Sequence, residues 1–468
     1  MSVLTIVGAV GDLVAIACFI QGLILLNAPA TARSGNRLAM AGMAIALVFA
    51  AWQTLGAAAL PIVIGIVVGG AIGVVAAMRV KMTAMPQMVA LYNGAGGGAA
   101  ALVSTVEFYH ILGTAAEGDP VVRVSLVLSA IIGCISFTGS IIAFLKLQEL
   151  MTGRPITYPG QQVVNALVAL AVAALAVWLV GFDGATTWWC FPLLLVLACG
   201  LGTLFVLPIG GADMPVVISL LNSFTGLAVA ITGFEIGSTL LIICGALVGA
   251  SGTLLTVLMG KAMNRPLTNV LFGAFGSGGG SEPAGGAGGG PQNVKSTSAD
   301  DVAIMLAYAQ KVMIVPGYGM AVAQAQHSVK ALADQLEKRG VKVSYAIHPV
   351  AGRMPGHMNV LLAEANVPYP ALLDMEDANP EFTTTDVALV IGANDVTNPA
   401  ARNVTSSPIY GMPILDVDKA NNVIVLKRSM RSGFAGIENP LYELDNTSML
   451  FGDAKASVDE LTAAVKAL

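Results

Sequence analysis

A glycine-rich turn in the C-terminal half has the spacing of a dinucleotide-binding motif. The sequence GYGMAVA at residues 317–323 follows the apolar run VMIV and precedes an amphipathic segment. In a strand–turn–helix unit of this kind, Gly317 permits a tight turn, Gly319 lets a ligand approach the backbone, and Ala323 allows close packing of helix on strand. The N-terminus of the following helix attracts a phosphate. The alternative is a structural turn that binds nothing.

The residue after the second predicted strand bears on which dinucleotide would bind. An Asp or Glu at that point holds the ribose 2′-hydroxyl of NAD and repels a 2′-phosphate. This chain instead has His348 and Pro349 after the run KVSYAI. Lys427 and Arg428, directly after the run VIVL, offer a guanidinium beside an ammonium, which suits a doubly charged phosphate. We therefore expect NADP, although the pair could also be a solvated surface pair.

Three polar residues lie inside or at the start of long apolar segments. Asn93 lies about 10 Å into its segment, Asp213 opens another, and Asn222 lies about 13 Å deeper than Asp213. Polar groups within a membrane are costly and are commonly functional. A polar file from His110 through Asn93 and Asn222 to Asp213 could carry a proton. The alternative is that the asparagines form hydrogen bonds between helices.

The composition separates two parts of the chain. Hydrophobic residues make up 56% of the 468 residues and charged residues only 11%, whereas a soluble protein carries about a quarter charged residues. Residues 1–275 hold 9 Lys and Arg and 8 Asp and Glu, against 14 and 20 in residues 276–468. The acidic C-terminal part argues against a nucleic-acid partner. The five cysteines lie in apolar runs without a metal-ligand spacing, so we expect no metal site.

The apolar segments predict a polytopic membrane domain. Nine of them are about 18 to 27 residues long, enough to cross about 30 Å of hydrocarbon as helices: residues 3–26, 38–56, 58–78, 86–112, 122–145, 163–181, 187–207, 213–234 and 239–260. Basic residues follow the first, third, fifth and ninth segments, while acidic residues occupy intervening loops. The positive-inside rule then predicts an external N-terminus and a cytoplasmic C-terminal domain.

The remaining sequence predicts a tether and an α/β domain. Residues 273–290 are glycine-rich and are typical of a flexible linker. We expect a membrane domain over residues 1–265, a linker over 266–297 and a nucleotide-binding domain over 298–468. Strand-like runs at 312–315, 342–347, 371–375, 387–392, 413–417 and 423–427 alternate with helical stretches at 322–339, 356–365 and 454–468. Ser298, three residues before Asp301, predicts a capped helix ahead of them. The pattern indicates a Rossmann-like, doubly wound parallel sheet.

Ordered motifs along the whole chain resemble one family. They include GGADMPVVISLLNSFTGLAVA, PGYGMAVAQAQ, VAGRMPGHMNVLLAEA, GANDVTNPAA, KRSM, AGIENPLY and MLFGDAKASV. The chain is similar to beta subunits of the proton-translocating NAD(P) transhydrogenase family. The resemblance implies reversible hydride transfer between NADH and NADP⁺, coupled to proton passage through the membrane domain. Such direct transfer uses no catalytic acid or base of the protein and no metal.

The resemblance also implies where the nucleotides and partners are. NADP(H) would bind to this chain and NAD(H) to an alpha subunit that brings further transmembrane helices, in a dimer of alpha–beta units in the bacterial inner membrane. The nucleotide of this family lies reversed relative to the usual Rossmann orientation. An alternative from another class is an ion channel or transporter gated by NADP(H), without redox turnover.

Site residues can be carried over from the family onto this sequence. The proton path would include Asn93, Asp213 and Asn222. The NADP(H) contacts would be Tyr318, Val350, Ala351, Gly352, Arg353, Met354, Pro355, Gly392, Ala393, Asn394, Asp395, Val396, Gly411, Met412, Lys427, Arg428, Ser429, Met430, Arg431, Ser432, Gly433, Phe434, Asp453 and Ala454. The pair Lys427 and Arg428 would bind the 2′-phosphate, and the stretch to Phe434 would fold over the cofactor as a lid.

Two positions depart from the family pattern. Some relatives have a histidine where this chain has Asn93, and an amide does not carry a proton at ordinary pH. A bound water would therefore carry it here, or the titrating group lies elsewhere. Phe434 stands where the family often has a tyrosine, which removes one hydroxyl from the expected lid.

Overall fold

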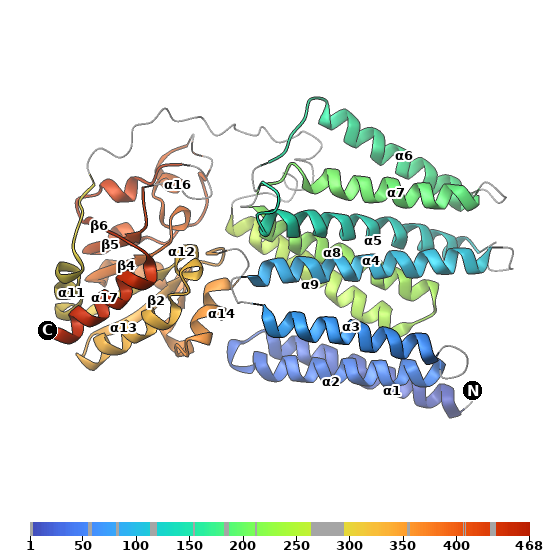
Figure 1. Ribbon diagram of the computed structural model, residues 1–468, viewed down its shortest axis with the longest axis horizontal. Coiled ribbons are helices and arrows are strands. Elements are labelled where there is room, and N and C mark those ends of the chain that lie inside the picture. The colour runs from blue at the N-terminus through green and yellow to red at the C-terminus, as the bar shows by residue number, and fades with distance from the viewer. Residues whose placement is uncertain are drawn as a thin grey trace. The chain divides into compact units, whose positions relative to one another are not determined.

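The computed structural model describes most of the chain as two compact units. The described residues are 3–54, 59–80, 84–112, 119–152, 155–181, 187–210, 213–263, 294–352, 356–405, 407, 409–430 and 437–468. One unit comprises Met1–Ile209 with Val217–Thr256, and the other comprises Gly210–Val216 with Val257–Leu468. The first is helical throughout, and the second contains the sheet (Figure 1).

The described residues of the N-terminal part form nine long helices. They are α1 (Val3–Leu26), α2 (Pro29–Thr54), α3 (Ala59–Arg79), α4 (Met85–Ile111), α5 (Pro120–Leu147), α6 (Gln161–Gly181), α7 (Thr187–Val206), α8 (Met214–Glu235) and α9 (Thr239–Ala262). Within the described residues, eight of them are long and apolar enough to cross a membrane. The exception is α4, which is 27 residues long but carries polar residues and a run of glycines. The predicted polytopic helical domain is confirmed.

Small residues let α4 and α5 pack closely along their length (Figure 1). A Cβ atom on Gly133 of α5 would lie 2.7 Å from the carbonyl oxygen of Gly97 on α4. Any larger residue at either position would separate the two backbones. The close approach brings polar side chains of the two helices within hydrogen-bond reach.

The C-terminal unit contains a six-stranded parallel sheet. Its strands are β1 (Lys311–Pro316), β2 (Lys342–Ile347), β3 (Leu372–Asp374), β4 (Val387–Ile391), β5 (Asn422–Lys427) and β6 (Thr447–Phe451). They lie in the order β3-β2-β1-β4-β5-β6, and all five pairings are parallel. This is the strand order of the doubly wound dinucleotide-binding fold, whose crevice lies where the order reverses, between β1 and β4. The predicted sheet is confirmed.

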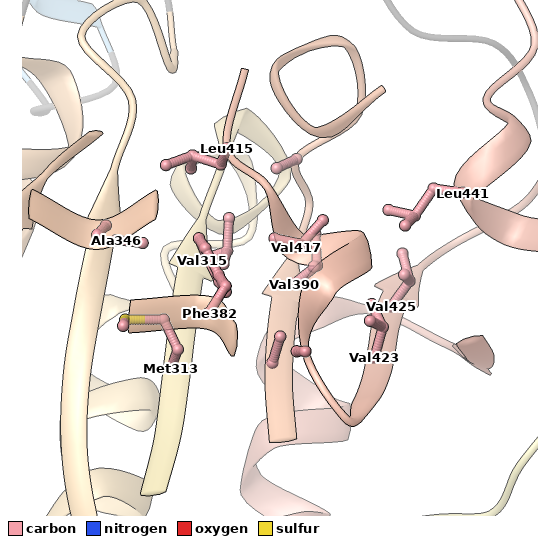
Figure 2. Close-up of a cluster of buried hydrophobic side chains, with 14 of the residues drawn as sticks. Met313, Val315, Ala346, Phe382, Val390, Leu415, Val417, Val423, Val425 and Leu441 are labelled. Atoms are coloured by element: carbon pink, nitrogen blue, oxygen red, sulfur yellow. The ribbon is translucent and has the colours of Figure 1, made fainter. Parts of the chain in front are cut away.

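Apolar layers cover both faces of the sheet. One face packs through strand residues such as Val315 and Val425 against Phe382, Leu415 and Leu441, as Figure 2 shows. Successive strand residues point to opposite faces, and the alternate residues of β1, β4 and β5 are also fully buried. The helices α11 (Ala299–Tyr308) and α13 (Gln326–Lys338) both pack against α17 (Ala454–Ala467), and α17 contacts β5. Both faces are covered, which explains the unbroken apolar runs of the central strands.

Two predicted elements of this domain are wrong. Residues 413–417 do not form a strand; their side chains fill the core, while their backbone bonds to loop groups such as Val396 and the side chain of Asn379. The sixth strand is β6 instead, which pairs with β5. The helix predicted over residues 322–339 begins later, as α13 at Gln326, and a separate short helix, α12 (Tyr318–Val322), precedes it. Gln324 between the two helices has a left-handed backbone with φ 51°.

The structure describes the residues before the sheet from Val294 onward. The predicted cap is confirmed, since the Ser298 hydroxyl accepts a hydrogen bond from the Asp301 amide at the start of α11. Ser296 forms a parallel bridge with Met449 of β6. The glycine-rich stretch at 273–290 lies outside the described residues.

Candidate functional site

The residues predicted to bind NADP(H) gather at the carboxyl edge of the sheet. Tyr318 follows β1; Val350, Ala351 and Gly352 follow β2; Gly392, Ala393, Asn394, Asp395 and Val396 follow β4; Lys427 ends β5, followed by Arg428, Ser429 and Met430; Asp453 and Ala454 follow β6. Arg353, Met354, Pro355, Arg431, Ser432, Gly433 and Phe434 lie outside the described residues. Segments far apart in sequence thus meet where a doubly wound sheet binds its ligand.

The loops after β1 and β4 cross in direct backbone contact. A Cβ atom on Gly319 would lie 2.7 Å from Cα of Gly392, and one on Gly317 would lie 2.3 Å from the Ala393 nitrogen. The amides of Gly317 and Gly319 donate to the carbonyls of Ile391 and Gly392, each at 2.9 Å. The glycines therefore serve the approach of one loop to another. The Gly319 face that could admit a pyrophosphate is filled by Gly392.

Asn394 organises a polar cluster directly after β4. Its side-chain oxygen accepts hydrogen bonds from the Tyr442 hydroxyl at 2.5 Å and the Asn439 amide at 3.2 Å. The Asn439 amide also donates to the Asn394 carbonyl at 3.1 Å. These bonds tie residues 439–442 to the end of β4. They hold the backbone of the predicted contact stretch 392–396 in one conformation.

Lys427 is a half-buried cation beside this cluster. Its ammonium lies 3.4 Å from the Tyr442 hydroxyl and 4.8 Å from the centre of that ring. Burial lowers the pKa of Lys427, and the charge of Asp395 partly offsets this effect. Within the described residues no carboxylate lies within ion-pair distance of the ammonium. Arg428 is exposed next to it. A desolvated ammonium without a paired carboxylate is suited to an anionic ligand.

By contrast, Arg402 of the same domain is already paired. Its guanidinium bonds to Asp416 at 2.8 Å and to Asp418 at 2.6 Å. Asp416 and Asp418 come directly after residues 411–415 in the sequence, next to Leu415 and Val417, which pack against the sheet. The ion pairs account for this arginine as a structural group and set Lys427 apart from it.

His348, the residue in place of the NAD-type acid, is a neutral structural group. It is buried after β2, and its Nε2 lies 2.8 Å from the Pro413 carbonyl oxygen. The Val350 amide donates to Nδ1 at 3.3 Å. Burial lowers the pKa of His348 to about 4. The contact draws the loop with Gly411 and Met412 to the end of β2, so these two predicted residues also reach the carboxyl edge.

In the membrane unit, Asn93 belongs to a buried polar cluster. Its amide donates to the hydroxyls of Ser140 at 2.9 Å and Ser136 at 3.4 Å on α5. Ser136 lies 2.5 Å from the hydroxyl of Thr225 on α8 and also donates to the Leu221 carbonyl at 2.9 Å. The side-chain oxygen of Asn93 is buried with no protein hydrogen-bond partner among the described residues. The cluster joins three helices through neutral groups.

A second cluster repeats this arrangement further along the same helices. Ser129 of α5 donates to the Ala228 carbonyl at 3.2 Å and lies 2.6 Å from the Thr232 hydroxyl. Ser129 lies seven residues before Ser136 on α5, and Thr232 lies seven residues after Thr225 on α8. This spacing keeps each pair on one face of its helix. Ser104 of α4 reaches both carboxylate oxygens of Glu235, at 3.0 and 2.9 Å. We call the two clusters together the polar seam.

The other predicted path residues stand outside the polar seam. Asn222 is half-buried on α8, and none of the hydrogen bonds above involves its side chain. Asp213 directly precedes α8, where its backbone amide donates to the Gly210 carbonyl at 3.2 Å; an acid is favourable at a helix N-terminus. The imidazole of His110 is 79% exposed and lies 3.7 Å from Glu107. The expected file through His110 is thus not continuous in this structure.

Several polar residues of both sites were absent from the sequence prediction. In the sequence, the serines, threonines and Glu235 of the polar seam resemble ordinary members of apolar segments or loops. Their seven-residue spacing, Ser129 to Ser136 and Thr225 to Thr232, was the available signal. Asn439 and Tyr442 lie in the quoted motif AGIENPLY, but nothing in their spacing connected them to Asn394.

The fold and its polar sites define a class: a polytopic membrane protein that carries a dinucleotide-binding domain. The family model for the NAD(P) transhydrogenase beta subunit matches residues 9–464. NAD(P) transhydrogenase subunit beta of Rhodospirillum rubrum is 52% identical over 452 residues, which cover 96% of each chain; the same subunit of a named strain of that species matches equally. The chain belongs to the NAD(P) transhydrogenase beta subunit family.

Proposed function

We propose that this chain binds NADP(H) and takes part in reversible hydride transfer between NADH, held by a partner alpha subunit, and NADP⁺. The transfer would be coupled to proton passage through the membrane unit. Family membership supports the use of nicotinamide nucleotides and a partner subunit. One dinucleotide-type sheet in the described chain supports the second nucleotide being on another polypeptide.

The residues at the carboxyl edge fit NADP(H) rather than NAD(H). The observation that carries this proposal is the half-buried Lys427 ammonium, which has no carboxylate within ion-pair distance among the described residues. With Arg428 it would hold the 2′-phosphate. The neutral His348 after β2 adds no negative charge to repel that phosphate. The contact of Gly319 with Gly392 supports the reversed nucleotide placement, because a pyrophosphate could not use the Gly319 face.

Bound NADP⁺ supplies the carbon that accepts the hydride, so the protein's work is to position and enclose it. Residues 392–396 are held by Asn439 and Tyr442, which keeps this wall of the site rigid. Rigid placement is worth a large part of a bimolecular barrier. Residues 427–434, which end in Phe434, would cover the cofactor and exclude water.

The proton path would run along the polar seam near Asn93. Hydroxyls both donate and accept hydrogen bonds, so Ser136, Ser140 and Thr225 can pass a proton without carrying a lasting charge. The buried, unpartnered side-chain oxygen of Asn93 could bind a water molecule of that path. Asp213 and Asn222 would complete the route at the end of α8 that begins at Met214.

Coupling would make NADP(H) affinity depend on protonation in the membrane. Linkage is reciprocal, so NADP⁺ and NADPH should shift the proton affinity of the path differently. We further propose that the chain resides in the bacterial inner membrane with its nucleotide domain in the cytoplasm. It would assemble with alpha subunits, which add transmembrane helices, as a dimer of alpha–beta units.

The test is hydride transfer by the chain together with its alpha subunit in sealed vesicles. NADH should reduce an NADP⁺ analogue, and an imposed pH difference across the membrane should change the rate. A rate indifferent to that pH difference would refute the coupling. Ion flux gated by NADP(H), without any reduction, would instead identify a channel.

A further inference from the structure

The cluster around Asn93, the first of the two that form the polar seam, lacks a group that can hold a proton. Asn93, Ser136, Ser140 and Thr225 are an amide and three hydroxyls, and none of these titrates in the physiological range. They can relay a proton but cannot store one. Coupling requires at least one group whose proton occupancy differs between two states of the protein.

Glu235 is a carboxyl group within the polar seam. It is the last residue of α8 and is only 9% exposed. Ser104 and Ser129 beside it are fully buried, and Thr232, one turn earlier on α8, is 3% exposed. A buried carboxyl in an apolar segment is costly unless it is compensated, and such residues commonly mark proton relays. The seam thus has its acid at one end and its amide at the other.

The geometry around Glu235 accommodates both protonation states. One hydroxyl, that of Ser104, lies 3.0 Å from Oε1 and 2.9 Å from Oε2. When the carboxyl is ionised, the Ser104 hydroxyl donates its one hydrogen to either oxygen. When it is protonated, its O–H can donate to the Ser104 oxygen while the other oxygen accepts the Ser104 hydrogen. Gain or loss of the proton therefore needs no rearrangement of α4 or α8.

We propose that Glu235 is the residue of this chain that takes up and releases the translocated proton at the α8–α9 end of the polar seam. The inference rests on the proposed function. The carboxylate gains a proton from the water phase at the end of α8. It passes that proton to the hydroxyls of Ser129 and Thr232, and these hand it on toward the Asn93 cluster. The amide of Asn93 cannot titrate, whereas the carboxyl group of Glu235, in the same polar seam, can.

Other charged groups lie around Glu235 on the neighbouring helices. On α4, Glu107 is one turn beyond Ser104 and lies 3.7 Å from His110. On α5, Asp119 caps the helix and accepts a hydrogen bond from the Val121 amide, and Arg123 donates to the Val180 carbonyl at 3.3 Å. The sequence of α9 has no charged residue before Lys261. None of these groups forms an ion pair with Glu235 within the described residues.

The test uses the complex with its alpha subunit in sealed vesicles and compares two substitutions. Glu235→Gln keeps the size of the side chain and can still bond to Ser104, but it cannot titrate. We expect proton uptake, followed with a pH-sensitive dye, to fall about 10²-fold, and NADP(H) affinity to lose its dependence on pH. Glu235→Asp keeps a titrating group and should restore part of the uptake with a shifted pH profile. Glu149→Gln, an exposed acid after α5, is the matched control and should behave as wild type.

The outcomes separate this inference from the proposed function. Wild-type vesicles that transfer hydride without moving protons would refute the coupling itself. Wild-type vesicles that move protons, with Glu235→Gln equal to them in rate and pH profile, would overturn only the role of Glu235. If Glu235→Gln does not assemble, Glu235→Asp and Ser104→Ala decide the question. A shifted pH profile of proton uptake in either variant supports the role of Glu235, and an unchanged profile in both overturns it.

Discussion

The two polar clusters of this protein are each organised by an asparagine, but they differ in charge. In the membrane unit, Asn93 donates to serine hydroxyls, and the contacts among Asn93, Ser136, Ser140 and Thr225 are all neutral. In the nucleotide domain, Asn394 accepts from Tyr442 beside the ammonium of Lys427. An isolated ion is costly in an apolar layer, whereas the edge of a sheet tolerates one.

The difference shows how each cluster could work. A cation at the sheet edge can hold an anion in place, because the attraction persists while the ligand is bound. Neutral hydroxyls cannot hold an ion, but their hydrogen bonds can reverse direction, which suits relay. The membrane cluster therefore needs a charge-storing group elsewhere, and the nucleotide cluster does not.

The largest effect on stability is expected at Gly317, where the loop after β1 contacts the backbone of the loop after β4. Gly317→Ala would place a Cβ atom 2.3 Å from the Ala393 nitrogen, so we expect a loss of about 3 kcal/mol in the free energy of unfolding of that domain. Resistance of residues 294–468 to proteolysis in the intact protein measures it. Gly200→Ala in α7, where nothing lies within 4 Å of the added carbon, should leave stability unchanged. Equal stability of both variants would contradict the crossing of the two loops.

Removal of the cation should have the next largest effect. Lys427→Ala deletes a charge-assisted contact worth about 1.5 to 3 kcal/mol, so the dissociation constant for NADP(H) should rise by about 10- to 100-fold. The apparent affinity for NADH, which we propose to bind on the alpha subunit, should not change. Equilibrium binding of NADPH, followed by its fluorescence, gives the result. Lys342→Ala, which removes the same charge at the opposite edge of the sheet, is the control, and equal losses in both variants would count against a phosphate site at Lys427.

The membrane side is tested by removing one hydroxyl. Thr225→Val keeps the shape of the side chain but breaks the 2.5 Å contact with Ser136. We expect proton uptake in vesicles to fall by about tenfold, below the usual contribution of a proton-transfer group, with NADP(H) affinity unchanged. Thr253→Val removes a hydroxyl from the α8–α9 contact with Ser223 and should have little effect. A full rate in Thr225→Val would place the path elsewhere.

The sequence predicted the elements better than the contacts between them. Continuous apolar runs were sufficient for β1, β4 and β5, because strands buried on both faces have that composition. The strand β6 was missed because it begins with Thr447 and Ser448, which leaves an apolar run of only Met449, Leu450 and Phe451. The seam contacts depend on which faces of α4, α5 and α8 meet, and apolar helices without a polar face do not reveal this. Likewise, Asn394 and Tyr442 are 48 residues apart in sequence and meet only through the fold.

The smallest effect at neutral pH is expected at His348. Burial lowers its pKa from 6.5 to about 4, so between these values the unfolded chain binds a proton that the folded domain does not. The stability from the neutral imidazole is complete above pH 6.5 and is lost as the pH falls toward 4, by up to about 3 kcal/mol. His348→Gln should remove this slope while leaving NADP(H) affinity at pH 7 unchanged. Hydrogen exchange of β2 in the intact protein, corrected for intrinsic rates, measures it, and an identical slope in the variant would show that another group titrates.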